Sequence, residues 1–206
     1  MSLSKVSEDV REHQLQSSWC FWYDKKMKKG EKDFNEYKAN LKKVHTFKTV
    51  EEFWKLYTHI KRPSSLDNNI NVYFFRDGPN HSPCWESFPN GGCWILKVKK
   101  RSHNSAGVIG KMWQDLVFAA IGEVFEEPTV IGIGMAIRTK EELLSVWNSD
   151  NSNDAIRFAI GEKLKEVLDL EPQTMIEYKH FKTSIEDMST YRHAKPYVFA
   201  ASQGVN

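Results

Sequence analysis

A large aromatic side chain directly precedes a carboxylate in a segment rich in turn-forming residues, the stretch CWESFPNGGCW from Cys84 to Trp94. The large surface of a tryptophan side chain is normally buried in a core. The Glu86 carboxylate cannot be buried beside Trp85 unless a partner pairs with it. Further along, Arg138 and Lys140 come just after an apolar run. These groups suit a positively charged base that bears phosphates. Rings stack on the base with a cation–π contribution of about 0.5–2 kcal/mol, a carboxylate accepts its hydrogen bonds, and Arg and Lys hold the phosphates.

Each of these features also has a purely structural interpretation. Trp85 can be a core residue while Glu86 points outward, and a basic pair after a strand can lie on a solvated turn. Catalytic interpretations find less support, because the sequence has no G-x-S-x-G, H-E-x-x-H or Gly-rich phosphate-loop motif and its seven histidines are scattered. We therefore expect a binding protein rather than an enzyme, without a metal or a cofactor.

Composition and charge limit the class of protein. With 206 residues, of which 40% are hydrophobic and 13% aromatic, the chain can bury a core as one domain. A net charge of +2 excludes strong nonspecific nucleic-acid binding driven by the whole protein. The three cysteines lack C-x-x-C spacing and indicate reduced thiols in the cytosol or nucleus. The polar N-terminus does not resemble a signal peptide, and no apolar run reaches bilayer length.

Patterns of apolar residues predict an α+β domain with a largely antiparallel sheet. We expect a flexible tail over residues 1–12, one domain over 13–200 and a C-terminal tail over 201–206. Asp24 and the lysines after it are expected to close the first strand, and Thr139–Trp147 is compatible with either a helix or a strand. Helices are expected at 49–60, 112–125 and 153–170, and strands at 17–26, 41–47, 71–78, 93–100, 129–138 and 174–181.

The first predicted helix carries an aromatic residue that its core stripe does not need. Thr49 and Glu52 have capping-box spacing, and Phe53 begins a stripe of apolar residues at helical spacing. Trp54 lies off this stripe, one turn from Val50. Trp54 either widens the core face or lies exposed on a surface that binds a partner protein.

Several motifs, in order from about His13 to about Tyr197, resemble those of the eukaryotic translation initiation factor 4E cap-binding proteins. HQLQSSWCFWY is similar to the family's His-Pro-Leu and paired-Trp opening, with Gln14 in place of Pro. TVEEFWKLY is close to the family's first-helix signature, and the series continues through FFRDG, CWES, NGGCW, MWQDLVFAAIGE, AIRTK and SVW. The resemblance implies a curved, mainly antiparallel sheet with helices packed on its convex face and a slot for the mRNA cap on its concave face.

The resemblance also implies which residues bind the base of the cap. Trp85 would stack on 7-methylguanine, and Glu86 would bind the ring nitrogen and amino edge of the base. Tyr37 would supply the second stacking ring, at a position where initiation factors usually carry Trp. Trp147 would touch the methyl group.

For the phosphates, Arg138 and Lys140 match binding positions of the family, but two other positions depart from its pattern. Leu143 stands where a further phosphate-binding Lys is common, and Cys93 replaces a basic residue. Both departures replace a positively charged residue, so both bear on how tightly the protein would bind the triphosphate of the cap. Tyr37 and Leu143 are more similar to the 4E-homologous branch, whose members often repress translation.

A second set of positions is implied to bind a partner protein. The partner would be the scaffold factor 4G or a 4E-binding repressor, through a Tyr-x-x-x-x-Leu-apolar helix. Gln114 departs from a usual Leu, which would weaken or change partner choice. The implied partner-binding residues are His13, Val50, Trp54, Gln114, Asp115 and Gly122.

The sequence is thus interpreted as a monomeric cap-binding protein that recruits a scaffold partner for translation initiation, in the cytoplasm and with the nucleus as a further compartment. A cap-binding translational repressor of the 4E-homologous type is the first alternative. A cap-processing enzyme and a general single-stranded RNA binder with stacking aromatics are the others.

Overall fold

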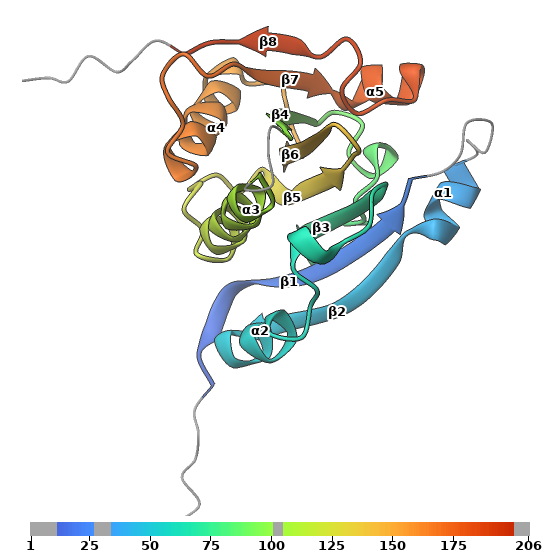
Figure 1. The fold of residues 1–206 in the computed structure, drawn as a ribbon, viewed down its shortest axis with the longest axis vertical. Helices are drawn as coiled ribbons and strands as arrows, with labels where there is room; N and C mark the ends of the chain where they lie inside the picture. The colour runs from blue at the N-terminus through green and yellow to red at the C-terminus, as the bar shows by residue number, and fades with distance from the viewer. Residues whose placement is uncertain (1–11, 27–33, 101–104, 200–206) are drawn as a thin grey trace, which may run out of the picture.

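The computed structural model describes residues 12–26, 34–100 and 105–199. The two expected tails lie outside these described residues, apart from Glu12. Figure 1 shows a curved sheet crossed by helices on both of its faces. All six predicted strands and all three predicted helices are present, so the prediction of an α+β domain is confirmed.

The sheet has eight strands, and each described pair of neighbours is antiparallel. The strand order is β2-β1-β3-β5-β6-β4-β7-β8. The short β8 was not predicted, because three residues carry too little pattern to be recognised. The strands are β1 (Gln14–Lys25), β2 (Lys42–Thr49), β3 (Ile70–Arg76), β4 (Gly92–Lys99), β5 (Val130–Ile137), β6 (Glu141–Asn148), β7 (Ile176–His180) and β8 (Lys195–Tyr197).

Long-range pairing decides the ambiguous segment Thr139–Trp147 in favour of a strand. β6 pairs with β4 along one edge and with β5 along the other, which makes it a central strand of the sheet. The capping-box spacing of Thr139 and Glu142 is not used. Instead, the Glu142 carboxylate forms an ion pair with Lys100, with 3.0 Å between oxygen and nitrogen.

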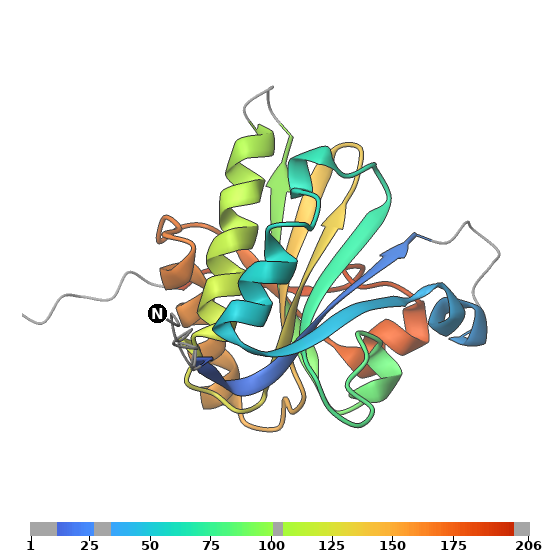
Figure 2. The ribbon, with the colours of Figure 1, turned by 90° about the horizontal axis from the view of Figure 1, so that it is seen from below.

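Three helices cover the convex face, as Figures 1 and 2 show. Thr49 caps the first of them, and its Oγ1 accepts a hydrogen bond of 3.2 Å from the backbone N–H of Glu52. No helix in the described part of the chain has both the length and the apolar character needed to cross a membrane. The three helices are α2 (Val50–Tyr57), α3 (Ser105–Ile121) and α4 (Asp154–Val167), and a 3-10 turn, η1 (Pro63–Ser65), follows α2.

Shorter elements lie on the opposite, concave side, where Figure 2 shows them gathered at one end of the sheet. They are α1 (Phe34–Asn40), the 3-10 turn η2 (Trp85–Ser87) and α5 (Phe181–Asp187). The sequence patterns did not predict α1 or α5. Helices of seven residues are below the length at which local propensity is sufficient, so contacts with the sheet must stabilise them.

Two hydrophobic clusters lie on the two faces of the sheet, because successive side chains of a strand point to opposite sides. Phe74 belongs to the convex cluster, where its ring stacks on Trp19 with centroids 4.7 Å apart. Its neighbours Tyr73 and Phe75 belong to the concave cluster. This alternation places the odd-numbered side chains of β3 on the concave side of the sheet.

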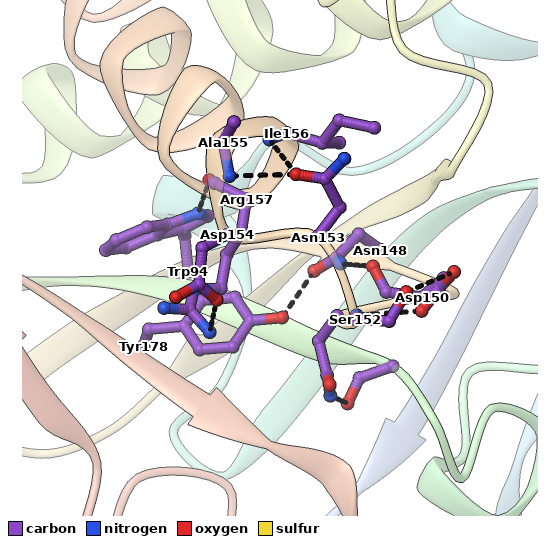
Figure 3. A network of polar contacts seen from close by, with 12 residues as sticks. Trp94, Asn148, Asp150, Ser152, Asn153, Asp154, Ala155, Ile156, Arg157 and Tyr178 are labelled. Atoms are coloured by element: carbon purple, nitrogen blue, oxygen red, sulfur yellow. Dashed lines mark hydrogen bonds and ion pairs between the residues drawn. The ribbon is translucent and has the colours of Figure 1, made fainter.

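A polar network ties α4 to strands β6, β4 and β7, in the half of the sheet that ends at β8 (Figure 3). The indole N–H of Trp94 donates to the backbone carbonyl of Arg157 (2.8 Å), and the Tyr178 hydroxyl donates to Asn148 Oδ1 (2.9 Å). The Asn153 side chain accepts from two backbone N–H groups in the first turn of α4. Because these bonds join β4, β6, β7 and α4, they stabilise the sheet from its convex side, away from the proposed slot.

Candidate functional site

Three parallel rows of side chains form the floor of the concave face, because the strand register pairs their members directly. Glycines of β5 lie in two of these rows. A Cβ at Gly132 would overlap the Phe75 ring, and one at Gly134 would lie 2.9 Å from Ser145 Oγ. The glycines therefore leave room for large side chains from neighbouring strands. The rows are Asp24-Asn71-Ala136-Leu143-Lys97, Trp22-Tyr73-Gly134-Ser145-Ile95 and Cys20-Phe75-Gly132-Trp147-Cys93.

The Trp–Glu pair lies in η2, at the side of this floor. Trp85 is half-buried and packs against the concave hydrophobic cluster. Glu86 is half-buried, and among the described residues its carboxylate has no hydrogen-bond or ion-pair partner. Trp85 is thus neither a fully buried core residue nor free in solvent, and the Glu86 carboxylate remains able to accept hydrogen bonds.

Tyr37 reaches the same place from α1. Its hydroxyl donates to the carbonyl of Pro83 (2.9 Å), two residues before Trp85, and lies 3.5 Å from the Tyr73 hydroxyl oxygen. Burial raises the pKa of Tyr37 well above its usual value, so this hydroxyl stays protonated. Within the described residues, neither Tyr37 nor Trp85 pairs with another aromatic ring. The structure therefore places the Tyr37 hydroxyl beside the turn that carries Trp85 and leaves both rings without an aromatic partner among the described residues.

Trp147 is placed differently from the expectation that it touches the methyl group of a ligand. Only 3% of its surface is exposed. The Phe181 ring of α5 lies 4.6 Å from it and the Phe75 ring 5.2 Å, centroid to centroid, and its indole N–H donates to Ser145 Oγ (3.0 Å). A ligand could reach this ring only after the covering side chains had moved.

The two basic residues after β5 differ in how firmly they are held. Arg138 Nη2 donates to Asn71 Oδ1 (2.7 Å) and Nη1 to the carbonyl of Ile137 (2.9 Å), whereas Nε is buried without an acceptor among the described residues. Burial lowers the pKa of Arg138, although a guanidinium remains charged. Lys140 is exposed. One cation is therefore fixed in orientation and the other is free to move.

The two departures from the family pattern lie in the floor. Leu143 and Cys93 are buried in the concave cluster, and burial raises the pKa of the Cys93 thiol to about 12. Neither can supply a positive charge for a phosphate. Lys97 lies directly across from Leu143 in the register, and its amino group forms an ion pair with Glu177 (2.7 Å).

Sequence reasoning missed Asp24, a residue of the floor. The first strand ends at Lys25, as the sequence predicted, but Asp24 is only 1% exposed and its side chain belongs to the floor. Burial raises its pKa, while hydrogen bonds from Asn71 and Tyr73 act in the opposite direction. These partners lie 47 and 49 residues away in sequence, so no local signal could have identified the contact.

On the convex side, Trp54 lies between the two interpretations that the sequence allowed, with 45% of its surface exposed. One edge of its ring packs near Phe118 of α3, with centroids 5.7 Å apart. Val50 is half-buried one turn earlier, and Gly122 is exposed just after the last residue of α3. We call the six residues His13, Val50, Trp54, Gln114, Asp115 and Gly122 the partner surface.

Polar contacts hold two members of this partner surface, His13 and Asp115. His13 Nδ1 lies 2.7 Å from Glu51 Oε1, and the His13 carbonyl accepts a hydrogen bond from the Val50 N–H (2.9 Å). Asp115 pairs with Lys111 one turn earlier (2.6 Å), and the neighbouring Gln114 is half-buried. The structure thus places all six residues at α2, α3 and the segments that adjoin these two helices.

A cavity of about 410 Å³ lies apart from both sets of residues. It is lined by side chains of β1, β2, β3, the segment after α2, and α3, including Val44, Ile60 and Trp113. None of the residues predicted to bind the cap or the partner lines it. The cavity lies beside the segment that follows α2, and polar side chains such as Lys61 and Asp67 line it together with the apolar ones.

Comparisons with known proteins agree with this geometry. The chain is 34% identical to eukaryotic translation initiation factor 4E-4 of Caenorhabditis elegans over 185 residues, covering 88% of this chain and 83% of that protein. It is also 34% identical to eukaryotic translation initiation factor NCBP of Triticum aestivum, with 88% and 75% covered.

Solved structures give the same result. A complex of C. elegans eIF4E-3 with the 4E-binding protein Mextli has a TM-score of 0.74 at 31% identity, covering 84% of this chain and 96% of that one. A complex of Ascaris suum eIF4E-3 with an m2,2,7G cap has a TM-score of 0.74 at 32% identity, covering 91% and 98%. A model of the eukaryotic initiation factor 4E family matches residues 14–196. This chain therefore belongs to the eukaryotic initiation factor 4E family.

Proposed function

We propose that this protein binds the 7-methylguanosine cap of mRNA on the concave face of its sheet, recruits a partner protein on the convex face, and acts in translation initiation in the cytoplasm. Its relatives support both parts of the proposal. The Ascaris suum protein was solved with an m7G cap and with an m2,2,7G cap, and the C. elegans protein with a 4E-binding protein. Membership of this family also favours an initiation factor over a cap-processing enzyme.

The observation that supports cap binding is that Tyr37 bonds beside the turn that presents Trp85 and Glu86, whose carboxylate has no partner among the described residues. The hydroxyl of Tyr37 bonds to Pro83, which holds this ring beside the turn that presents Trp85 and Glu86. In the proposed complex the two rings stack on the methylated base. The carboxylate accepts hydrogen bonds from the base edge and also favours its positive charge.

The phosphates extend toward the end of β5. Arg138 uses two of its five N–H groups to bond Ile137 and Asn71, which leaves the others without an acceptor among the described residues, while Lys140 can turn toward a phosphate from solvent. We assign Trp147 the methyl contact, which requires the Phe181 side chain to shift. Because Leu143 and Cys93 are buried and uncharged, the triphosphate gains less charge compensation than the usual family pattern supplies.

The partner proposal rests on the exposed half of Trp54. A large, partly exposed aromatic side chain beside an apolar neighbour is typical of an interface hot spot. The proposed ligand is a Tyr-x-x-x-x-Leu-apolar helix, in a scaffold factor of the 4G type or in a 4E-binding repressor. This helix would lie across α2 and α3.

A repressor of the 4E-homologous type is the second candidate. Two observations favour it: Tyr37 replaces the usual Trp, and Leu143 replaces a common Lys. Such a protein would occupy the cap without recruiting the scaffold. A general single-stranded RNA binder would instead stack any base and would not distinguish the methylated one.

Elution from a methylated-cap resin tests the proposal. The wild-type protein should be released by 7-methyl-GTP and not by GTP, and the proteins that co-elute should include a scaffold factor. Release by both nucleotides at equal concentration would contradict cap recognition in favour of general RNA binding. Retention of 4E-binding repressors without the scaffold would identify the second candidate.

Two tryptophan variants provide matched controls on the same resin. Trp85→Leu should lose retention, because loss of one stacking ring costs about 1–3 kcal/mol. Trp54→Ala removes an equally large ring on the convex side and should be retained like the wild type. Equal retention of both variants would remove Trp85 from the proposed slot.

A further inference from the structure

A buried carboxylate lies in the floor between the two ends of the proposed slot. Asp24 is 1% exposed, and each of its oxygens accepts one hydrogen bond, from Asn71 Nδ2 (2.5 Å) and from the Tyr73 hydroxyl (3.1 Å). Carboxylates are seldom buried to this degree unless partners pair with them. Asp24 has no part in the proposed ligand contacts, so its burial calls for a separate explanation.

Through Asn71, Asp24 is connected to Arg138 at the end of the slot that would bind the phosphates. The Asn71 amide donates to Asp24 through Nδ2 and accepts from Arg138 Nη2 through Oδ1 (2.7 Å). An ionised carboxylate only accepts hydrogen bonds, so it requires the NH₂ group of Asn71 to face it. The amide oxygen must then face the guanidinium. Asp24 in this way selects the amide orientation that holds Arg138.

The other side of this arrangement leads to the base-stacking end. Tyr73 gives its only hydroxyl proton to Asp24, so its oxygen presents lone pairs toward the Tyr37 hydroxyl 3.5 Å away. The Tyr37 hydroxyl therefore has two acceptors for its one proton, the Tyr73 oxygen and the carbonyl of Pro83 (2.9 Å), and shares the proton between them. The Tyr37 ring, which would stack on the base, is thus held at its hydroxyl both by the Asp24–Tyr73 pair and by the turn that carries Trp85.

We propose that Asp24 is a positioning residue for cap binding: its carboxylate orients Asn71 and Tyr73, and through them it holds Arg138 and Tyr37 in the places that the cap requires. The inference rests on the proposed function. A single buried group would then couple the phosphate end of the slot to the stacking end. The contacts run through side chains of β1, β3 and α1, which keeps the slot geometry on the rigid sheet.

Asp24→Asn tests this role, because it keeps the shape of the side chain and replaces one acceptor oxygen by a donor. The variant should bind 7-methyl-GTP about five-fold to ten-fold more weakly, the equivalent of one or two net hydrogen bonds. The affinity for 7-methylguanosine without phosphates should also fall, because the stacking end is affected as well. Its melting temperature should equal or exceed that of the wild type, because burial of a charged carboxylate disfavours the folded state.

A carboxylate variant on the other face is the matched control. Glu123 is half-buried and pairs with Arg76, with 2.7 Å between Oε1 and Nη1, on the convex side. Glu123→Gln should lower the melting temperature and leave cap affinity unchanged. A loss of melting temperature in Asp24→Asn like that of Glu123→Gln, with unchanged cap affinity, would show that Asp24 is merely structural and would overturn the inference.

A double-mutant cycle with Tyr37 tests whether Asp24 acts on cap affinity through Tyr37 or independently of it. In a cycle of Asp24→Asn, Tyr37→Phe and the double variant, the loss of affinity in the double variant should be smaller than the product of the two single fold-changes. Tyr73→Phe, which removes only the connecting hydroxyl, should weaken cap binding by about five-fold. Independent, multiplicative losses would overturn the inference, as would wild-type affinity in both Asp24→Asn and Tyr73→Phe. If the wild-type protein itself does not bind the cap analogue, the proposed function fails before the role of Asp24 is reached.

Discussion

The concave and convex faces of the sheet are built on different physical principles. On the concave face, the residues assigned to the cap rest on hydrogen bonds of defined direction: Tyr37 on Pro83, and Arg138 on Asn71. On the convex face, the exposed half of Trp54 rests on aromatic edges such as Phe118, and no hydrogen bond from a described residue fixes its ring.

This difference indicates what each face can discriminate. A floor with directional bonds positions individual ligand atoms, so removal of one charge or one hydroxyl should change selectivity. An apolar anchor gains its energy from buried area, which tolerates variation in the partner sequence but depends on the large side chain itself. The two faces should therefore respond to different kinds of substitution.

The largest expected effect concerns the convex face. Trp54→Ala should cost about 3 kcal/mol in binding to a Tyr-x-x-x-x-Leu-apolar peptide, since hot-spot truncations typically cost 2 kcal/mol or more. Its cost in stability should be about 1 kcal/mol, because nearly half of the ring is already in solvent. Isothermal titration with the peptide, thermal melting and cap titration measure the three quantities.

Met175→Ala is the control for this prediction, because Met175 is 53% exposed and lies between α4 and β7, away from α2. It should leave peptide binding unchanged. A large drop in the melting temperature of Trp54→Ala would show that the ring is a core residue. Intact peptide binding would move the partner surface elsewhere.

Glu86→Gln should reveal selectivity on the concave face. The substitution keeps the shape of the side chain but removes its charge, and a charge-assisted hydrogen bond is worth about 2 kcal/mol. We expect the preference for 7-methyl-GTP over GTP to fall by roughly 30-fold, measured by fluorescence titration with both nucleotides. An unchanged preference would mean that Glu86 is an outward-pointing residue of the loop.

The sequence predicted features that depend on local contacts and missed features that depend on distant ones. Thr49 could be identified as the cap of α2 because its partner, Glu52, lies three residues away. The burial of Asp24 depends on Asn71 and Tyr73, which the register of β1 and β3 brings alongside it. Likewise, only pairing with β4 and β5 decides that Thr139–Trp147 contains a strand.

For the candidate site, too, the sequence was informative about some residues and silent about contacts that depend on distant elements. Motif order predicts Trp85, Tyr37 and Arg138 as members of one slot, because the family resemblance carries the fold with it. The resemblance did not indicate that Trp147 lies beneath Phe181. That contact depends on α5, a helix too short to be recognised from its sequence pattern.

Tyr37→Trp should have a smaller effect than Glu86→Gln, because two consequences oppose each other. Indole is the better cation–π partner, which from the sequence alone predicts equal or tighter cap binding. The structure adds a loss, since Trp cannot reproduce the hydroxyl contacts with Pro83 and Tyr73. We expect a net change within about 1 kcal/mol, whereas Tyr37→Phe should weaken binding. A large gain with Trp would show that the hydroxyl contacts do not position the ring.

The smallest expected effect on cap binding concerns the positive charge of Lys97 on the concave face, which an ion pair already neutralises. Lys97 lies across from Leu143 in the floor, and its ion pair with Glu177 offsets its charge. Glu177→Gln should strengthen 7-methyl-GTP binding by about 0.4 kcal/mol, the Coulomb energy of one charge at roughly 10 Å in water. Raising the salt concentration should abolish the gain, and binding of 7-methylguanosine should not change.

Glu166→Gln makes the same change in net charge on α4, where Glu166 pairs with Lys163 (2.8 Å), and should have no effect. An equal gain in both variants would attribute the effect to net charge, and the concave face would then offer the triphosphate no latent cation at Lys97.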